Sequence, residues 1–178
     1  LENPVRPFVA ILGGSKVSGK IDVIRQLLSK CDTIIIGGGM MFTFYKAMGL
    51  EIGNSLIEED RVSLAAELIT EAKQAGVQLL LPTDVVVADS FSNDAKFKNV
   101  SIDNIEAGWV GMDIGNNSRE QFTSIISSAK TVVWNGPMGV FEMPNFAGGT
   151  RSVADAMVSA TESGATTIIG GGDSAAAI

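Results

Sequence analysis

The feature that most constrains this chain is a set of glycine-rich turns, each placed directly after an apolar run. Thr166–Ile169 precedes Gly170–Gly172, and Ile34–Ile36 precedes Gly37–Gly39. Variants of the pattern occupy residues 8–16 and 131–139. A strand, a glycine turn and a helix start suit an anion, because bare backbone N–H groups approach phosphate and the helix dipole favours negative charge. The pattern predicts that these strand ends line one crevice.

Apolar runs alternate with helical patterns along the chain. Most of the runs have no polar interruption, as in strands that are covered on both faces. We therefore predict the α/β class: a Rossmann-like three-layer sandwich with a mostly parallel open sheet and helices on both faces. Strands are expected at Phe8–Leu12, Thr33–Ile36, Val77–Leu81, Val85–Ala88, Thr131–Trp134 and Thr166–Ile169, with an extended piece at Gly108–Asp113. Ligands of such sheets bind outside the carboxyl ends of the strands, where the glycines stand.

Helical spacing and capping residues predict the helices between these strands. They are expected over Val17–Lys30, Met40–Met48 and Ser55–Ala75, and further along from Asn117 and from Thr150. Asn117 and Glu120 resemble a capping box, and Thr150 is expected to be an N-cap. The buried face of Ser55–Ala75 is predicted to consist of Val62, Ala65, Ala66, Ile69 and Ala72. Residues 90–104 are polar and predict a loop or a hairpin.

Composition restricts partners and chemistry. A net charge of −7 argues against nucleic acid, because phosphate affinity needs clustered Lys and Arg. No apolar stretch approaches the roughly 18–20 residues of a membrane span, so no membrane partner is expected. Cys31 is the only cysteine, which favours a reducing, cytoplasmic setting and a small core residue. The chain has no histidine, which excludes Ser-His-Asp and Cys-His catalysis and favours positioning and electrostatics.

Several of these motifs have more than one interpretation. The segment from Gly14 to Lys20 nearly matches a P-loop, but Ile21 stands where Ser or Thr would hold Mg²⁺. Residues 170–175 loosely match the dinucleotide-binding pattern. The acidic residue that binds the ribose in that pattern would stand about 20 residues later. Asp173 is either an ordinary N-cap or a Mg²⁺ ligand. Glu142 either accepts hydrogen bonds from a ribose or lies in solvent.

Taken together, these segments resemble the C-terminal, nucleotide-binding half of phosphoglycerate kinases from end to end. The matching segments are Ala10–Ile21, Ile35–Met40 with Phe42–Phe44, Leu81–Asp89, Trp134–Glu142 and Ile169–Ser174. Trp134–Glu142 is the most diagnostic. The resemblance implies phosphoryl transfer between 1,3-bisphosphoglycerate and ADP, giving 3-phosphoglycerate and ATP, in glycolysis and gluconeogenesis. It also implies Mg²⁺ as Mg-ADP or Mg-ATP, and a monomeric, cytoplasmic full-length enzyme.

The resemblance also implies roles for individual residues. Lys16 would neutralise the phosphoryl group in flight, with the amides of Gly171 and Gly172 facing it, and Asp173 would approach the Mg²⁺. The implied nucleotide-binding residues are Gly14, Ser15, Lys20, Gly38, Gly39, Phe91, Met112, Asn135, Gly136, Pro137, Val140, Glu142, Gly171, Gly172, Asp173 and Ser174. Glu142 would bind the ribose. The adenine slot would be formed by Gly38, Gly39 and Met112, with Phe91 beside them.

By the same resemblance, residues 1–178 are one domain of a longer enzyme. Leu1 is not an initiating Met. The N-terminal substrate domain, which would hold 3-phosphoglycerate or 1,3-bisphosphoglycerate, and a final C-terminal segment are expected to be missing. The chain alone should then bind ADP or ATP without turnover. Met41 and Asn116 stand where this family more often has Ala and Pro. The rival interpretations are a P-loop NTPase or Rossmann dehydrogenase, and a non-enzymatic adenine-nucleotide sensor or scaffold.

Overall fold

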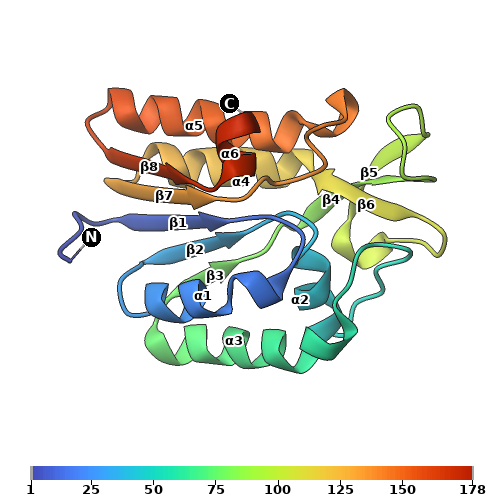
Figure 1. The fold of residues 1–178 in the computed structure, drawn as a ribbon, viewed down its shortest axis with the longest axis horizontal. Coiled ribbons are helices and arrows are strands. Elements are labelled where there is room, and N and C mark those ends of the chain that lie inside the picture. Colours follow the sequence, from blue (N-terminus) through green and yellow to red (C-terminus); the bar gives the residue numbers. More distant parts are fainter. Residues whose placement is uncertain (1, 178) are drawn as a thin grey trace.

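A five-stranded parallel sheet forms the centre of the computed structural model, which describes residues 2–177 and, for residues 173, 174 and 177, the backbone alone (Figure 1). The strand order is β3-β2-β1-β7-β8. The strands are β1 (Phe8–Leu12), β2 (Thr33–Ile36), β3 (Gln78–Leu80), β7 (Thr131–Asn135) and β8 (Thr166–Gly170). Because every pairing is parallel, all five carboxyl ends lie along one edge of the sheet.

Helices cover both faces of this sheet, so the predicted three-layer α/β architecture is confirmed. On one face lie α1 (Ile21–Leu27), α2 (Met41–Ala47) and α3 (Val62–Ala75), and on the other lie α4 (Asn116–Ser127) and α5 (Gly148–Glu162) (Figure 1). The short α6 (Gly172–Ala177) follows β8. Every residue of β1 and β2 is buried, whereas the edge strand β8 is partly exposed. The uninterrupted apolar runs thus mark the centre of the sheet.

A separate three-stranded antiparallel sheet, with the order β5-β4-β6, was not predicted. Its strands are β4 (Asp84–Ala88), β5 (Phe97–Ser101) and β6 (Val110–Ile114). Residues 90–104, predicted as a loop or a hairpin, contain the loop after β4 and the strand β5, which pairs antiparallel with β4. Val85 and Val87 pack into the main core while Val86 and Ala88 pack into a second one. The apolar run of β4 therefore reports two buried faces, not parallel pairing.

The helix predicted over Ser55–Ala75 begins later than expected. A short 3-10 helix spans Glu59–Arg61 and α3 starts at Val62. Ser55 is buried, and its Oγ accepts a hydrogen bond from the Gly111 amide at 2.8 Å, so tertiary contacts fix this segment as a loop. The predicted inward face is also partly wrong, because Ala66 is exposed and Leu68 is fully buried. The helix predicted over Val17–Lys30 is likewise shorter, with a 3-10 helix at Val17–Gly19 before α1.

The two predicted N-caps are wrong for a common reason. Gly115 precedes α4, and the carboxylate of Asp84 accepts the amides of Asn117 and Ser118 at 3.0 and 2.9 Å. Thr150 lies inside α5, where its buried Oγ1 accepts the Met138 amide at 3.0 Å. In both places a contact between distant segments replaces the local cap that the sequence suggested.

Candidate functional site

A cavity of about 510 Å³ lies at the carboxyl edge of the parallel sheet. The turns after β1, β2 and β7 contribute one side of it, and β6 with the loop between α2 and α3 contributes the other. The structure brings many of the predicted nucleotide residues together in its lining. These are Gly14, Ser15, Gly38, Gly39, Phe91, Met112, Pro137, Val140 and Glu142. Three of the four glycine turns therefore share one crevice, and the turn at 170–172 does not line it.

The glycines of these turns are required by close packing between backbones. Gly38 has φ of 71°, and a Cβ there would collide with the backbone of Gly14. Gly136 has φ of 98°, and a Cβ there would collide with Gly13. The amides of Gly13, Gly14 and Gly38 donate to the carbonyls of Asn135, Pro137 and Met138 at 2.8, 3.0 and 3.0 Å. Because these amides are already engaged, glycine here lets three turns interlock and does not supply donors for a phosphate.

The inner part of the cavity is apolar. Met41, Phe42 and Met112 are buried in its wall, and Phe42 lies so close to Gly111 that a Cβ on Gly111 would overlap the ring. At the mouth, Leu56 and Phe91 stay 50% and 64% exposed. Exposed apolar side chains flanking an apolar slot suit a flat, weakly polar ring such as a nucleobase. The exposed carboxylate of Glu142 is the one acidic group in the lining, whose residues all lie in the described part of the chain.

Several residues of this wall were not predicted from the sequence. They are Phe42, Asn54, Leu56, Val110, Gly111, Met138 and Gly139. Met138 and Gly139 lie inside the diagnostic segment Trp134–Glu142, so their neighbourhood was signalled. Leu56 was assigned to the wrong class of element, because residues 55–75 read as one helix, and Asn54 directly precedes that segment. Their place in the wall depends on tertiary contacts that have no local signature.

A polar cluster lies beside the cavity, where β7 and β8 end. The Nζ atom of Lys20 donates to Oδ1 of Asn135 at 2.5 Å. Asn135 pairs in register with Gly170, and a Cβ built on Gly171 would lie 3.0 Å from the same Oδ1. Lys20, Asn135 and the fourth glycine turn therefore meet, although none of them lines the cavity. Lys16 is exposed at the start of the 3-10 helix Val17–Gly19.

A buried ion pair supports the far wall of the cavity from behind. Asp113 is fully buried, and its Oδ2 accepts from Arg119 at 3.0 Å and from the Gly149 amide at 2.9 Å. Burial raises the pKa of Asp113 to about 6, although the amides of Gly149 and Ile114 and the charge of Arg119 oppose the shift. Two residues of the cavity wall adjoin Asp113. Gly139 lies directly against its carboxylate, and Met112 precedes it in the sequence. The pair thus joins β6, α4 and α5 behind the wall.

A protein-built metal cage is not found in the described part of the chain. No group of three or more Cys, Asp and Glu side chains there could hold a metal ion. Mg²⁺ does not require such a cage, because it commonly keeps its waters and binds through one or two carboxylates together with substrate phosphates. The side chains of Asp173, the predicted metal ligand, and of Ser174 lie outside the described part of the structure.

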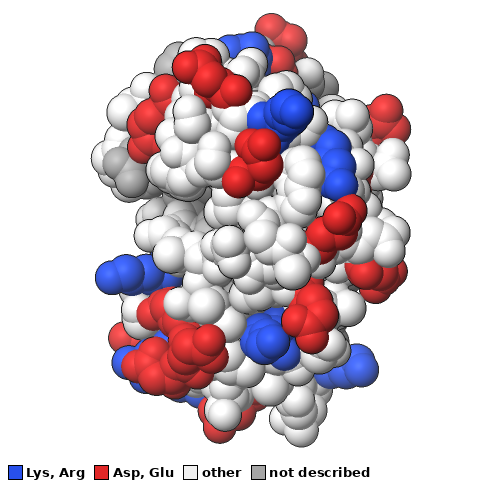
Figure 2. All heavy atoms as spheres, turned by 90° about the vertical axis from the view of Figure 1, so that its right-hand side faces the viewer, with Lys and Arg blue, Asp and Glu red and all other residues white. Residues whose placement is uncertain are grey.

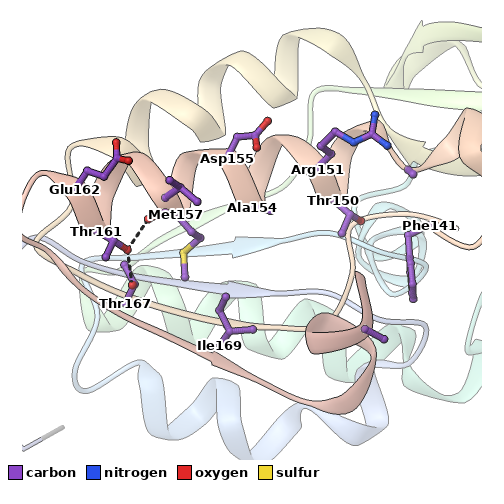
Figure 3. Close-up of a pocket in the computed structure, with 13 residues that line it drawn as sticks. Phe141, Thr150, Arg151, Ala154, Asp155, Met157, Thr161, Glu162, Thr167 and Ile169 are labelled. Carbon is purple, nitrogen blue, oxygen red and sulfur yellow. Dashed lines mark hydrogen bonds between the residues drawn. The ribbon is translucent and has the colours of Figure 1, made fainter. Parts of the chain in front are cut away.

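A second hollow of about 630 Å³ lies between α5 and β8, away from the three interlocked turns (Figure 3). Figure 3 shows Met157 and Ile169 facing it, with Thr161 and Thr167 joined by a hydrogen bond of 2.7 Å between their Oγ1 atoms. It contains none of the predicted site residues. The cavity at the carboxyl edge is therefore the better candidate for the functional site.

The surface at the small-sheet end carries mixed charge. Figure 2 shows Lys and Arg side chains interspersed with Asp and Glu on this face, rather than gathered into one basic patch. Such a face lacks the clustered positive charge that nucleic-acid backbones require. Within residues 2–177, no helix combines the length and apolar character needed to cross a membrane.

Comparison with known proteins assigns the family. The family model described as phosphoglycerate kinase matches residues 1–178, the whole chain. The chain belongs to the phosphoglycerate kinase family. Phosphoglycerate kinases of Chloroherpeton thalassium and Nostoc sp. are 59% and 58% identical over 176 and 178 residues, which cover 99% and 100% of this chain. The chloroplastic phosphoglycerate kinase 1 of Arabidopsis thaliana is 58% identical over 178 residues and 100% of this chain.

Solved structures of phosphoglycerate kinases have the same fold. The enzyme from Coxiella burnetii matches 99% of this chain with a TM-score of 0.95 and 45% identity, and the enzyme from Pyrococcus horikoshii matches 94% with a TM-score of 0.73 and 25% identity. This chain spans only part of each relative. It covers 44% of the Chloroherpeton and Nostoc proteins, 37% of the Arabidopsis protein, and 45% and 47% of the two solved chains.

Proposed function

We propose that residues 1–178 are the nucleotide-binding, C-terminal domain of a phosphoglycerate kinase. The observation that carries the proposal is the cavity at the carboxyl edge, where an apolar slot opens beside Lys20 and Asn135. The complete enzyme would transfer a phosphoryl group between 1,3-bisphosphoglycerate and ADP, giving 3-phosphoglycerate and ATP. The remaining length of the relatives supplies room for a separate substrate domain, which would hold the phosphoglycerate.

In this proposal the cavity binds one part of the nucleotide and the polar cluster beside it binds the other. The base enters the apolar slot between Leu56 and Phe91, and Glu142 accepts the ribose hydroxyls at the mouth. The phosphates extend toward Lys20 and Asn135, whose side chains already contact each other. The terminal phosphate would lie between Lys16 and the turn at 170–172.

The chemistry of the transfer is compatible with a chain that has no histidine. In the ATP-consuming direction the nucleophile is a carboxylate, which is ionised at neutral pH, so no general base is required. Rate enhancement then depends on in-line placement and on charge stabilisation. Lys16 supplies positive charge to the moving phosphoryl group, and the amides of Gly171 and Gly172 donate to its oxygens. Mg²⁺, bound with the nucleotide and approached by Asp173, would neutralise phosphate charge.

Binding and turnover separate this proposal from its rivals. Titration calorimetry of residues 1–178 is expected to show binding of Mg-ADP and no binding of NAD. The full-length protein encoded by the same gene is expected to phosphorylate 3-phosphoglycerate with ATP, whereas the chain alone is not. NAD binding would favour a dehydrogenase. Nucleotide binding without any transfer by the full-length protein would favour a sensor or scaffold.

The setting of the full-length enzyme is also part of the proposal. We propose a monomer in the cytoplasm, where the single buried thiol of Cys31 stays reduced. Burial, the largest effect, raises the pKa of Cys31 to about 12, so the thiol is unreactive and fits a core residue. The name of the Arabidopsis relative places that protein in the chloroplast, and the location of this protein is tested by fractionation of its native cells.

A further inference from the structure

The loop between α2 and α3 contacts two sides of the candidate cavity. In this loop the backbone amide of Asn54 donates to the Trp109 carbonyl at 2.8 Å, and Oγ of Ser55 accepts from the backbone amide of Gly111. Leu56 packs against Gly39 so closely that a Cβ on Gly39 would lie 2.8 Å from its Cδ2 atom. The loop is thus fixed both to the small sheet and to the glycine turn after β2.

The end of this loop is held in place as firmly as its start. The amide of Glu58 donates to Oγ1 of Thr43 at 3.2 Å, and Thr43 is buried in α2. The backbone of Glu58 therefore has a defined position relative to the parallel sheet.

The carboxylate of Glu58 binds the turn that follows Lys16. Its Oε1 accepts the Ser18 amide at 3.2 Å. Ser18 belongs to the 3-10 helix Val17–Gly19, which begins after Lys16 and has no side-chain cap of its own. A lysine at the cap position has no acceptor to offer, so a carboxylate from a distant loop takes that place.

Electrostatics agree with the geometry. Burial alone would raise the pKa of Glu58, but hydrogen bonds from Ser18 and Val17 and the positive charge of Lys16 lower it below its usual value. Glu58 is therefore ionised at neutral pH, with the Lys16 charge close enough to act on it. Among the described residues, no hydrogen bond or ion pair joins the Glu58 carboxylate to the Lys16 ammonium group, which leaves that group available to a phosphate.

We propose that Glu58 is a positioning residue for Lys16: by holding the turn that follows Lys16, it fixes where the ammonium group lies. The inference rests on the proposed role of Lys16 in phosphoryl transfer. Lys16 is exposed, and Gly19 in the turn after it stands in open space, where a Cβ would meet nothing within 4 Å. An exposed lysine beside such a turn needs an anchor, because loss of orientation at a reacting group costs rate more than binding.

Kinetics of the full-length enzyme test the proposal through two opposed substitutions. Glu58→Asp keeps the charge but withdraws the oxygen from Ser18, and is expected to lower kcat about tenfold with a change in KM for Mg-ADP of less than about twofold. Glu58→Gln keeps an acceptor oxygen in place, and is expected to retain kcat within about threefold. Glu59→Ala is the matched control, since Glu59 is an exposed neighbour with no hydrogen bond or ion pair among the described residues.

A double-mutant cycle shows whether Glu58 acts through Lys16. Adding Glu58→Asp to Lys16→Ala is expected to lower kcat no further, because the group being positioned is absent. Equal losses in both backgrounds would overturn the proposal, as would Glu58→Asp behaving like Glu59→Ala. A Lys16→Ala enzyme with unchanged kcat would instead refute the proposed role of Lys16 itself. Thermal unfolding of each variant shows whether a lost rate reflects unfolding. A tenfold loss of kcat in Glu58→Gln as well as in Glu58→Asp would also count against the proposal.

Discussion

Two glycines with the same backbone angle show how packing decides the need for glycine. Gly38 and Gly76 have φ of 71° and 72°, but a Cβ on Gly38 would strike Gly14 and Pro137, whereas Gly76 has nothing within 4 Å. Gly76→Ala is expected to cost about 1 kcal/mol, from the left-handed conformation alone. Gly38→Ala is expected to cost about 3 kcal/mol or more, because the turns must also separate. Urea unfolding of both variants measures the difference, and equal losses would contradict the interlocked turns.

Asp113 provides a prediction about pH. Its pKa is raised to about 6 by burial, so between about pH 4 and 6 the folded state holds a proton that the unfolded state has released. The stability contributed by this group is therefore fully present below its unfolded pKa and is lost as the pH rises through about 6. Asp113→Asn is expected to remove this loss, so its unfolding free energy falls less than that of the wild type between pH 4.5 and 7.

The control for that measurement is Asp103→Asn, at an exposed carboxylate. It is expected to leave the slope of stability against pH unchanged. The slope rather than the absolute value is the test, and an unchanged slope would show that Asp113 does not titrate in this range.

At the scale of elements, the carboxylate of Asp84 fixes the start of α4 by accepting its first amides. Asp84 is buried in β4, and accepts from the amides of Asn117 and Ser118 and from Nδ2 of Asn99 at 2.9 Å. Asp84→Ala is expected to destabilise the chain by about 2–4 kcal/mol, because it leaves the buried Ser118 amide and two partly buried donors without their acceptor. Asn117→Ala is expected to cost less than about 0.5 kcal/mol. Guanidinium unfolding distinguishes them, and a large loss in the Asn117 variant would restore the local capping box.

At the scale of the whole molecule, the cavity needs both sheets. Phe91 lies in the loop between β4 and β5, while the glycine turns belong to the parallel sheet. Phe91→Ala is expected to weaken Mg-ADP binding about tenfold, because one apolar face of the base slot is lost. Met48→Ala is a suitable control, since Met48 is 51% exposed and outside the cavity. Calorimetry measures both affinities, and an unchanged affinity for the Phe91 variant would place the base elsewhere.

The sequence by itself determined the parallel core. Runs such as Phe8–Leu12 and Thr33–Ile36 are stable only as strands that are buried on both faces. The glycines after them mark their carboxyl ends. The turns at 13–14, 37–39 and 136–139 were therefore predictable as neighbours. Part of the diagnostic segment Trp134–Glu142, namely residues 137–140 and Glu142, lines the cavity at the edge where those strands end.

Only the tertiary structure decided how the wall of the cavity closes. Ser55 and Glu58 fit a helical pattern, but Gly111, Thr43 and Ser18 bind them from distant parts of the chain and hold them in a loop. Tertiary contacts also place β4 in the small sheet and not in the parallel one, because its two faces pack against two different cores. Periodicity reports how many faces of a segment are buried, but not against what. The partner of each face is a property of the whole fold.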